Sequence, residues 1–143
     1  MASEIFIDTS GFFATLDAHD QWHDKSRQLG NQATTRSTRY VTTDYVLCET
    51  LTLLRSRHLG RFAQPWLVNL LPTNKCRIIW MNPERFDQVR RFFVKHHDKA
   101  WSFTDCFSFC VMQERKMQQA LASDDHFRQA GFEPLLVPES SAS

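Results

Sequence analysis

Short runs of apolar residues alternate along the chain with longer stretches in which apolar residues recur every three or four positions. The short runs predict β-strands at residues 4–8, 39–42, 76–80, 119–122 and 133–137. The longer stretches predict helices at residues 9–16, 20–33, 44–58, 61–71, from 83 onward, 103–117 and 124–130. Because strands and helices alternate throughout, we predict a three-layer α/β/α fold with a mainly parallel central sheet.

Capping and helix-breaking residues set the predicted ends of these elements. Asp44 and Ser102 are suited to cap the helices that follow them, because their side chains can accept a hydrogen bond from a free backbone N–H group. We expect Gly60 to end the helix that begins at Asp44. Pro65 lacks a backbone donor and predicts a kink or a late start in the helix around it. Pro134 places the last strand at an edge of the sheet.

Four acidic residues lie within or directly after apolar segments, where an ionised carboxylate is unfavourable unless it is paired or binds a metal ion. They are Asp8, Glu49, Asp105 and Asp124. Each one alone has an ordinary explanation as a turn residue, a helix cap or one half of a buried ion pair. Four of them, spread over the whole chain, predict one acidic pocket that the fold assembles. A hard divalent cation such as Mg²⁺ or Mn²⁺ is the natural occupant of a pocket lined by oxygen atoms.

The predicted elements bring three of these carboxylates to one end of the sheet. Asp8 ends the first strand and Asp124 follows the fourth, and ligands of open parallel sheets bind beyond the carboxyl ends of the strands. Asp105 lies in the first turn of a helix, where the helix dipole favours an anion. Glu49 lies on a helix that is apolar on two sides, so its side chain is predicted to face the interior.

The charge of the chain is nearly balanced, since 17 Lys and Arg residues oppose 16 Asp and Glu residues. The resulting net charge of +1 does not by itself indicate a nucleic-acid-binding protein. The positive charges are nonetheless clustered. One basic cluster comprises Arg55, Arg57, His58 and Arg61, and a second lies within residues 85–99. Each cluster alone is explained by a solvated helix face, but both could steer a polyanion.

The length of 143 residues fits one domain, which we place at residues 1–138, followed by a flexible tail at residues 139–143. The four cysteines lie inside apolar segments, where a free thiol packs as a small hydrophobic group. Neither a signal peptide nor a transmembrane stretch is evident in the sequence. We therefore expect a cytoplasmic protein with reduced cysteines and no association with a membrane.

Three other classes of phosphate chemistry do not fit the sequence. A phosphotransferase of the haloacid dehalogenase type needs a second Asp two residues after the first, and Ser10 occupies that position. A response-regulator receiver domain needs an acidic pair near the first strand and a late lysine, and the sequence has neither. A glycine-rich phosphate-binding loop, which would support nucleotide binding, is also missing from the sequence.

The sequence around the four acids resembles the successive motifs of the PIN-domain nucleases, and most closely those of the VapC-type toxins of bacterial toxin–antitoxin pairs. The segments that carry the resemblance are Ile7-Asp8-Thr9-Ser10, Leu47-Cys48-Glu49-Thr50-Leu51, Ser102-Phe103-Thr104-Asp105-Cys106 and Ala122-Ser123-Asp124-Asp125-His126-Phe127. They occur in the family's order, and the resemblance extends over residues 5–137. Phe107 and Pro65 depart from the family pattern, and both departures concern packing rather than the acids.

The resemblance implies a PIN-like fold and a divalent-metal-dependent endoribonuclease that hydrolyses RNA phosphodiester bonds. The residues to which it assigns both catalysis and the binding of Mg²⁺ (or Mn²⁺) are Asp8, Glu49, Asp105 and Asp124. It gives supporting roles to Thr9, Thr104 and Asp125. The residues expected to hold the phosphates of the substrate are Arg55, Arg57 and Arg61. His126 is close enough to Asp124 to be considered as a general acid, but the resemblance assigns it no role.

The resemblance also implies three partners of the chain. These are an RNA substrate, an antitoxin protein that blocks the cleft, and a second copy of the chain in a homodimer. One alternative stays open, in which the chain is a catalytically idle PIN-like module that binds RNA or protein without cleaving it. The four intact acidic positions favour the enzyme over this alternative.

Overall fold

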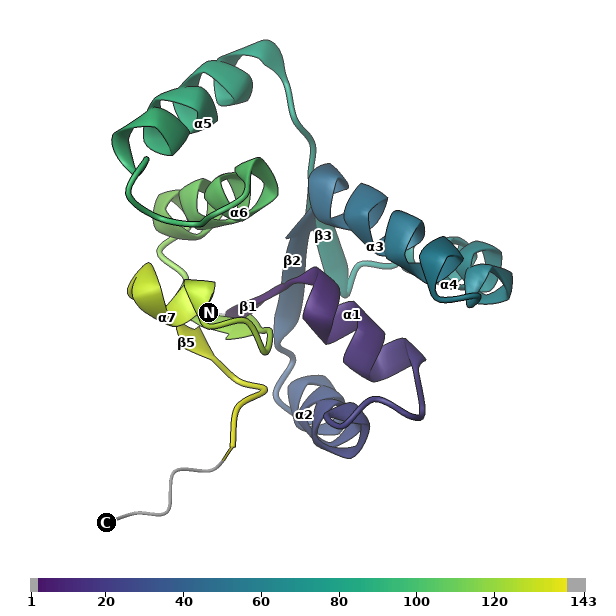
Figure 1. Ribbon diagram of the computed structural model, residues 1–143. Helices are drawn as coiled ribbons and strands as arrows, with labels where there is room; N and C mark the ends of the chain where they lie inside the picture. Colours follow the sequence, from purple (N-terminus) through teal and green to yellow (C-terminus); the bar gives the residue numbers. More distant parts are fainter. Residues whose placement is uncertain (1–2, 139–143) are drawn as a thin grey trace.

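The computed structural model describes residues 3–138 and shows a five-stranded parallel sheet with helices on both faces (Figure 1). The strands are β1 (Glu4–Ile7), β2 (Arg39–Thr43), β3 (Cys76–Ile79), β4 (Gln119–Leu121) and β5 (Glu133–Pro134). Their order across the sheet is β3-β2-β1-β4-β5, and each neighbouring pair is parallel. The predicted α/β/α fold is therefore confirmed.

The helices form the two outer layers of the fold. On one face lie α1 (Thr9–Leu16), α2 (His23–Thr35), α3 (Asp44–Ser56), a short 3₁₀ helix (Gly60–Phe62) and α4 (Ala63–Leu70). On the other lie α5 (Pro83–Lys95), α6 (Phe103–Glu114) and α7 (His126–Gln129) (Figure 1). Among the described helices, none is both long and apolar enough to cross a bilayer. The predicted tail at residues 139–143 lies outside the described residues, and the single domain over residues 1–138 stays a prediction.

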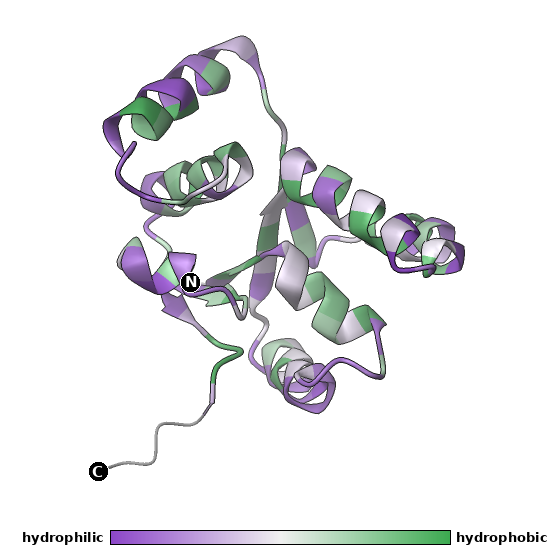
Figure 2. Cartoon of the chain, in the orientation of Figure 1, coloured by the Kyte–Doolittle hydropathy of each residue, from purple (hydrophilic) through white to green (hydrophobic). Residues whose placement is uncertain are grey.

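Apolar side chains of the sheet and of the inner helix faces form the core. Phe6, Val41 and Ala120, which lie on three adjacent strands, are fully buried. On one face of the sheet, Phe109 of α6 and Phe127 of α7 meet edge to face with their ring centroids 5.1 Å apart. The strands and the outer helices both carry hydrophobic stretches, and hydrophilic stretches are prominent on the outer helices (Figure 2).

The start of α3 differs from the prediction. Thr43 rather than Asp44 is the cap, because Thr43 ends β2 in an extended conformation and its hydroxyl accepts the Val46 N–H at 3.1 Å. Asp44 already lies in the helix. Its carboxylate accepts a hydrogen bond from the Met81 N–H at 3.0 Å, which ties α3 to the loop after β3.

The end of α3 also differs, because the helix stops at Ser56 and Gly60 does not terminate it. His58 takes the left-handed conformation, with φ at 60°, that a terminating glycine would adopt. The Leu59 N–H then closes the turn onto the Leu54 carbonyl at 2.7 Å. Gly60 begins the 3₁₀ helix instead.

The predicted effects of Pro65, Ser102 and Pro134 are confirmed, although α6 ends at Glu114 and not at residue 117 as predicted. Pro65 lies in the first turn of α4, where backbone N–H groups lack helical partners, so the helix starts late rather than kinking. Ser102 caps α6, and its hydroxyl accepts the Asp105 N–H at 3.0 Å. Pro134 lies in β5 at the edge of the sheet, although this strand ends there and not at residue 137 as predicted.

One close approach between a helix and the sheet fixes the geometry near the ends of β1 and β4. A Cβ atom at Gly11 of α1 would lie 2.1 Å from the Leu121 carbonyl oxygen, so only glycine fits at this position. The same carbonyl accepts the Asp8 N–H at 3.2 Å. The residues that follow β1 and β4 are therefore held at a short and fixed separation.

Candidate metal centre

The strand order reverses between β1 and β4, and the polar residues of the site gather beyond the carboxyl ends of these two strands. From β1 the chain continues into α1 on one face of the sheet, whereas from β4 it continues into α7 on the other (Figure 1). In parallel sheets a crevice opens at such a reversal and is the usual place for a ligand. Asp8 directly follows β1, and Asp124 lies in the loop between β4 and α7.

Asp8 is the most buried of the four predicted acids, with 6% of its surface exposed. Burial, followed by the nearby charge of Asp105, raises the pKa of Asp8 to about 7, and the charges of Glu49 and Asp124 add to this rise. The Ser10 hydroxyl donates to Asp8 Oδ2 at 3.4 Å. Asp8, Glu49 and Asp124 line one cavity, and Asp105 lies beside Asp124, so the structure brings the four carboxylates together.

Glu49 faces the same group of acids from α3. Burial raises the pKa of its carboxyl group, a hydrogen bond from the Thr9 side chain opposes this rise, and the charges of Asp105 and Asp124 add to it. Thr9 is itself buried, and the Thr50 hydroxyl donates to its hydroxyl at 3.4 Å. The structure thus places Thr9 where it can orient the Glu49 carboxylate from the start of α1.

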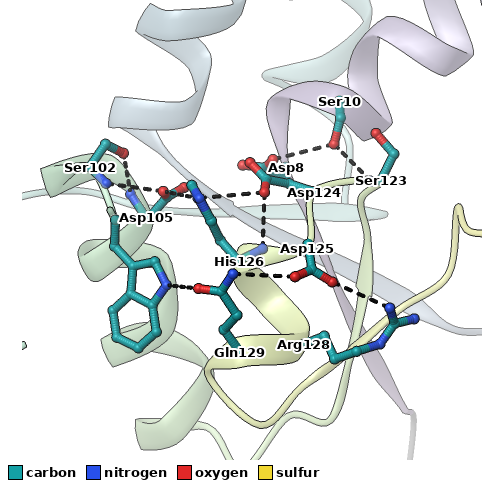
Figure 3. Close-up of polar contacts among 11 residues, drawn as sticks. Asp8, Ser10, Ser102, Asp105, Ser123, Asp124, Asp125, His126, Arg128 and Gln129 are labelled. Atoms are coloured by element: carbon teal, nitrogen blue, oxygen red, sulfur yellow. Dashed lines mark hydrogen bonds and ion pairs between the residues drawn. The ribbon is translucent and has the colours of Figure 1, made fainter. Parts of the chain in front are cut away.

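Asp105 and Asp124 approach each other around His126 (Figure 3). Asp105 lies in the first turn of α6, where its carboxylate accepts the Ser102 N–H at 3.0 Å and completes a capping box. His126 Nδ1 lies 2.9 Å from Asp105 Oδ2 and 3.4 Å from Asp124 Oδ1. One potential metal-ligating atom from each of these three residues lies within 4.8 Å of the other two.

A cavity of about 250 Å³ opens over three of the four acids, and Asp105 lies outside its lining. Its lining includes Asp8, Glu49, Asp124, Asp20 and Arg57. Asp20 is a fifth carboxylate that the sequence analysis did not single out, and it also accepts the Trp22 N–H at 2.8 Å. The Arg57 guanidinium lies 4.7 Å from the centre of the Phe13 ring, which places a positive charge on the cavity wall. Arg57 is therefore the predicted substrate-binding arginine that the structure brings to the acids.

Arg55 and Arg61, the other two arginines expected to bind substrate, lie outside the lining of this cavity. Both side chains are exposed. The Arg61 guanidinium lies 4.6 Å from the centre of the Phe62 ring and donates to the His58 carbonyl at 3.3 Å. These two arginines belong to the surface formed by the end of α3 and the 3₁₀ helix.

Two of the residues expected to have supporting roles are placed differently from Thr9. Asp125 is exposed, and its carboxylate accepts hydrogen bonds from Arg128 at 3.3 Å and from Gln129 at 3.2 Å (Figure 3). It therefore stabilises α7 and does not join the other acids. Thr104 lies in the first turn of α6, and its carbonyl oxygen accepts the Ser108 hydroxyl at 3.0 Å.

Two residues to which the family resemblance assigns no role connect the parts of the site. The Ser10 hydroxyl accepts the Ser123 N–H at 3.0 Å and donates to Asp8, so it joins the start of α1 to the loop after β4 (Figure 3). His126 joins two of the acids in a similar way. Both residues make contacts with partners that are distant along the chain, and no local sequence signal marks such contacts.

The donor set of this site fits a hard divalent cation. Oxygen ligands are those that Mg²⁺ and Mn²⁺ prefer. Burial and mutual repulsion disfavour the ionised carboxylates, and a cation bound among them would offset both effects. The residues that could hold it are Asp8, Glu49, Asp105 and Asp124.

Comparisons with known proteins give a family model and a solved structure that match most of the chain. The PIN domain family model matches residues 5–133. The 23S rRNA-specific endonuclease VapC20 of Mycobacterium tuberculosis, from strains CDC 1551 / Oshkosh and ATCC 25618 / H37Rv, is 31% identical over 128 residues, which cover 90% of this chain and 95% of the relative. A crystal structure of M. tuberculosis VapC20, described as a sarcin–ricin loop cleaving toxin, matches with a TM-score of 0.78 at 31% identity. That match covers 90% of this chain and 95% of the other.

Proposed function

The chain belongs to the PIN-domain family, and on this basis we propose that it is a divalent-metal-dependent endoribonuclease of the VapC toxin type. It hydrolyses phosphodiester bonds in RNA. One observation carries the proposal: three carboxylates from separate elements lie around the buried Asp8 at the strand-order reversal, and their charges help to raise its pKa. Groups with strongly perturbed pKa values in a crevice are typical of functional sites.

The residues that would hold Mg²⁺ or Mn²⁺ are Asp8, Glu49, Asp105 and Asp124. When bound, such an ion lowers the pKa of a water molecule for in-line attack and neutralises the negative charge that develops on the phosphate. The Ser10 hydroxyl donates to Asp8 at 3.4 Å, and the Thr9 side chain lies beside Glu49, where it opposes the rise in the pKa of that carboxyl group. Polar groups placed beside the carboxylates before the substrate arrives reduce the reorganisation required during the reaction.

Arg57 is the residue best placed to bind the RNA backbone near the acids. Its guanidinium lies on the cavity wall and is held over the Phe13 ring. Contacts between arginine and phosphate supply affinity and position the RNA, but they carry little sequence preference. Arg55 and Arg61 extend the positive surface away from the cavity, so they would contact phosphates farther along the RNA.

The relatives suggest the class of RNA that is cleaved. The M. tuberculosis VapC20 is named as specific for 23S rRNA, and its crystal structure is described as that of a sarcin–ricin loop cleaving toxin. Because the similarity spans 90% of this chain, we propose the same ribosomal RNA loop as its substrate. The cytoplasm, where ribosomes are found, would then be the place of action.

Cleavage of a sarcin–ricin loop oligonucleotide and of intact ribosomes tests this function. With Mg²⁺ or Mn²⁺ present, Asp8→Asn and Asp105→Asn are each expected to lower the cleavage rate by about 100-fold or more, because each removes a charge that holds the ion. Asp98→Asn, which changes an exposed acid after α5, is the matched control and should cleave like the wild type. Cleavage that survives both site substitutions and EDTA would overturn the proposal.

The alternative function is a catalytically idle module that binds RNA or protein. The same assay distinguishes this alternative from the nuclease. An idle module would bind the oligonucleotide and leave it uncleaved at every metal and protein concentration. The gathering of carboxylates around the buried Asp8 favours the enzyme, since RNA binding alone is served by positive charge.

We further propose that a small antitoxin protein restrains this enzyme by covering the cavity over the acids. The M. tuberculosis relative is described as a toxin, and a nuclease directed at ribosomal RNA would harm the cell that makes it unless it is inhibited. Growth arrest on expression, relieved by the product of a neighbouring gene, is the expected result. Harmless accumulation of the active enzyme would count against an antitoxin.

A further inference from the structure

His126 contacts two of the acids from different elements, Asp105 and Asp124, and the proposed function does not use it. We propose that His126 is a positioning residue, which holds the carboxylates of Asp105 and Asp124 in the arrangement that binds the divalent cation. This inference rests on the proposed metal-dependent function. It gives His126 a role in metal affinity and none in proton transfer.

The hydrogen bonds of His126 define this role. Its Nδ1 atom lies 2.9 Å from Asp105 Oδ2 and 3.4 Å from Asp124 Oδ1, and its backbone N–H donates to Asp124 Oδ1 at 2.9 Å (Figure 3). A carboxylate can only accept hydrogen bonds, so the proton is on Nδ1. The N–H dipole between the two carboxylates reduces their repulsion and sets the distance between them.

Asp105 is held on one oxygen atom only. Its Oδ2 atom accepts both the Ser102 N–H at 3.0 Å and the His126 Nδ1–H at 2.9 Å. Within residues 3–138, the hydrogen bonds of the Asp105 carboxylate are made through Oδ2, which leaves Oδ1 for a metal ion. Hydrogen bonds that orient a metal-binding carboxylate in this way raise metal affinity.

The packing of α7 holds the backbone of His126 in place. The next residue, Phe127, is fully buried and packs on Phe109 and Phe6 with ring centroids 5.1 Å and 6.2 Å away. At the end of the helix, the Gln129 amide oxygen accepts the Trp101 indole N–H at 3.1 Å. Because α7 is anchored at Phe127 and at Gln129, it can hold His126 in one orientation. A solvated histidine at the start of a helix would not need such anchoring.

Direct ligation by His126 Nδ1 is the competing explanation, and the geometry disfavours it. A nitrogen atom that donates its proton to Asp105 has no lone pair for a metal ion. Substituting asparagine separates the two roles, because the Asn amide nitrogen occupies roughly the position of Nδ1 and keeps the donor without the ring. His97→Ala, which removes an exposed histidine after α5, is the control for the loss of an imidazole.

Calorimetry with Mn²⁺ in the absence of RNA tests the inference, with circular dichroism to establish that each variant is folded. We expect His126→Ala to weaken Mn²⁺ binding by about 10- to 100-fold, His126→Asn to recover most of the loss, and His97→Ala to bind like the wild type. Unchanged Mn²⁺ affinity in His126→Ala would overturn the inference. So would a failure of folded His126→Asn to recover affinity, or nitrogen coupling to Mn²⁺ from His126 in pulsed electron paramagnetic resonance of the wild type.

The metal measurement and the RNA assay can fail independently. The proposed function would be overturned, and the inference left intact, if the wild type cleaves no RNA but binds Mn²⁺ more tightly than His126→Ala does. Active enzyme whose His126→Ala variant binds Mn²⁺ normally would overturn the inference and leave the function intact.

Discussion

Among the described acidic residues, Asp8 is the one whose ionised form is most disfavoured by its surroundings. A carboxylate that is buried beside three others is unstable as an anion, and its pKa of about 7 expresses that instability. Without metal, the protein therefore holds Asp8 partly protonated near neutral pH. A proton and a divalent cation then compete for the same oxygen atoms, so the stability of the protein should depend on pH and on metal together.

The unfolding free energy of the metal-free protein should fall as the pH rises. Folding raises the pKa of Asp8 from 3.8 to about 7, so the stability linked to this group is complete below about pH 4 and is lost as the pH rises through 7. The loss from Asp8 is ~4 kcal/mol at most, since one pKa unit corresponds to ~1.4 kcal/mol. Urea unfolding in EDTA at several pH values measures it.

Asp8→Asn is the control for this pH dependence, because it keeps the shape of the side chain and removes the titrating group. The variant should be more stable than the wild type at pH 8 in EDTA, and the difference should shrink toward pH 4. Saturating Mg²⁺ should stabilise the wild type at pH 8 and have little effect on the variant. Parallel pH curves for the two proteins would contradict the assignment of the effect to Asp8.

At the scale of elements, three helices direct their N-terminal ends toward the acids. Asp8 immediately precedes α1, Asp105 lies in the first turn of α6, and Asp124 lies just before α7. The first N–H groups of a helix lack helical partners, and the helix dipole is positive at this end. These three helix ends therefore offset part of the negative charge of the site before any cation binds.

Replacing Gly11 tests how closely α1 must approach β4 to form this arrangement. Gly11→Ala should destabilise the protein by about 1–3 kcal/mol, because the new Cβ atom would lie 2.1 Å from the Leu121 carbonyl oxygen. Gly30→Ala in α2 is the matched control, since its Cβ would meet nothing within 4 Å. That change should stabilise the protein by about 0.5–1 kcal/mol through helix propensity.

Thermal and urea unfolding of the two glycine variants give the measurement. A shift of α1 in the Gly11→Ala protein would also move Asp8, so its Mn²⁺ affinity should fall while that of Gly30→Ala should not. Equal stability of the two variants would mean that α1 can move away from β4 at little cost, and it would contradict the expected effect of the close approach at Gly11.

At the scale of the whole molecule, one face of α5 leaves aromatic rings exposed. Phe86 and Phe93 are 47% and 42% exposed, and both pack on Phe103 at the start of α6 with ring centroids 5.2 Å and 5.6 Å away. Arg90 and Arg91 both pair with Asp87 on the same helix, which reduces repulsion between two copies of it. We propose this aromatic face as the contact of the homodimer that the family resemblance implies.

Light scattering at matched concentrations tests this contact. The double substitution of Phe86→Glu and Phe93→Glu should convert a dimer into a monomer, because it places four like charges at the contact of two copies. Val68→Glu, which alters an exposed apolar residue on α4, is the control and should leave the dimer intact. A monomeric wild type, or a double variant that stays dimeric, would contradict the proposed contact.

The elements and the acids of the site could be predicted from sequence because both leave local signals. Strand and helix periodicity extends over a few neighbouring positions, and a carboxylate such as Asp8 is conspicuous after an apolar strand. The helix ends were less predictable. Thr43, and not Asp44, caps α3, and His58, and not Gly60, takes the left-handed conformation after it. The tertiary structure sets where the chain enters and leaves α3, and this determines which residue adopts each conformation.

By itself, the sequence determined the alternation of strands and helices and the presence of four carboxylates in apolar segments, since both depend on residues close together in the chain. Only the tertiary structure decided which polar groups serve the site. In the folded protein, the Asp125 carboxylate bonds to residues of α7, and Arg57 lies on the cavity wall. The Ser10 hydroxyl bonds to Ser123, which lies 113 positions away in the sequence. Such contacts depend on the strand order and on the packing of helices against the sheet, and a local pattern of residues encodes neither.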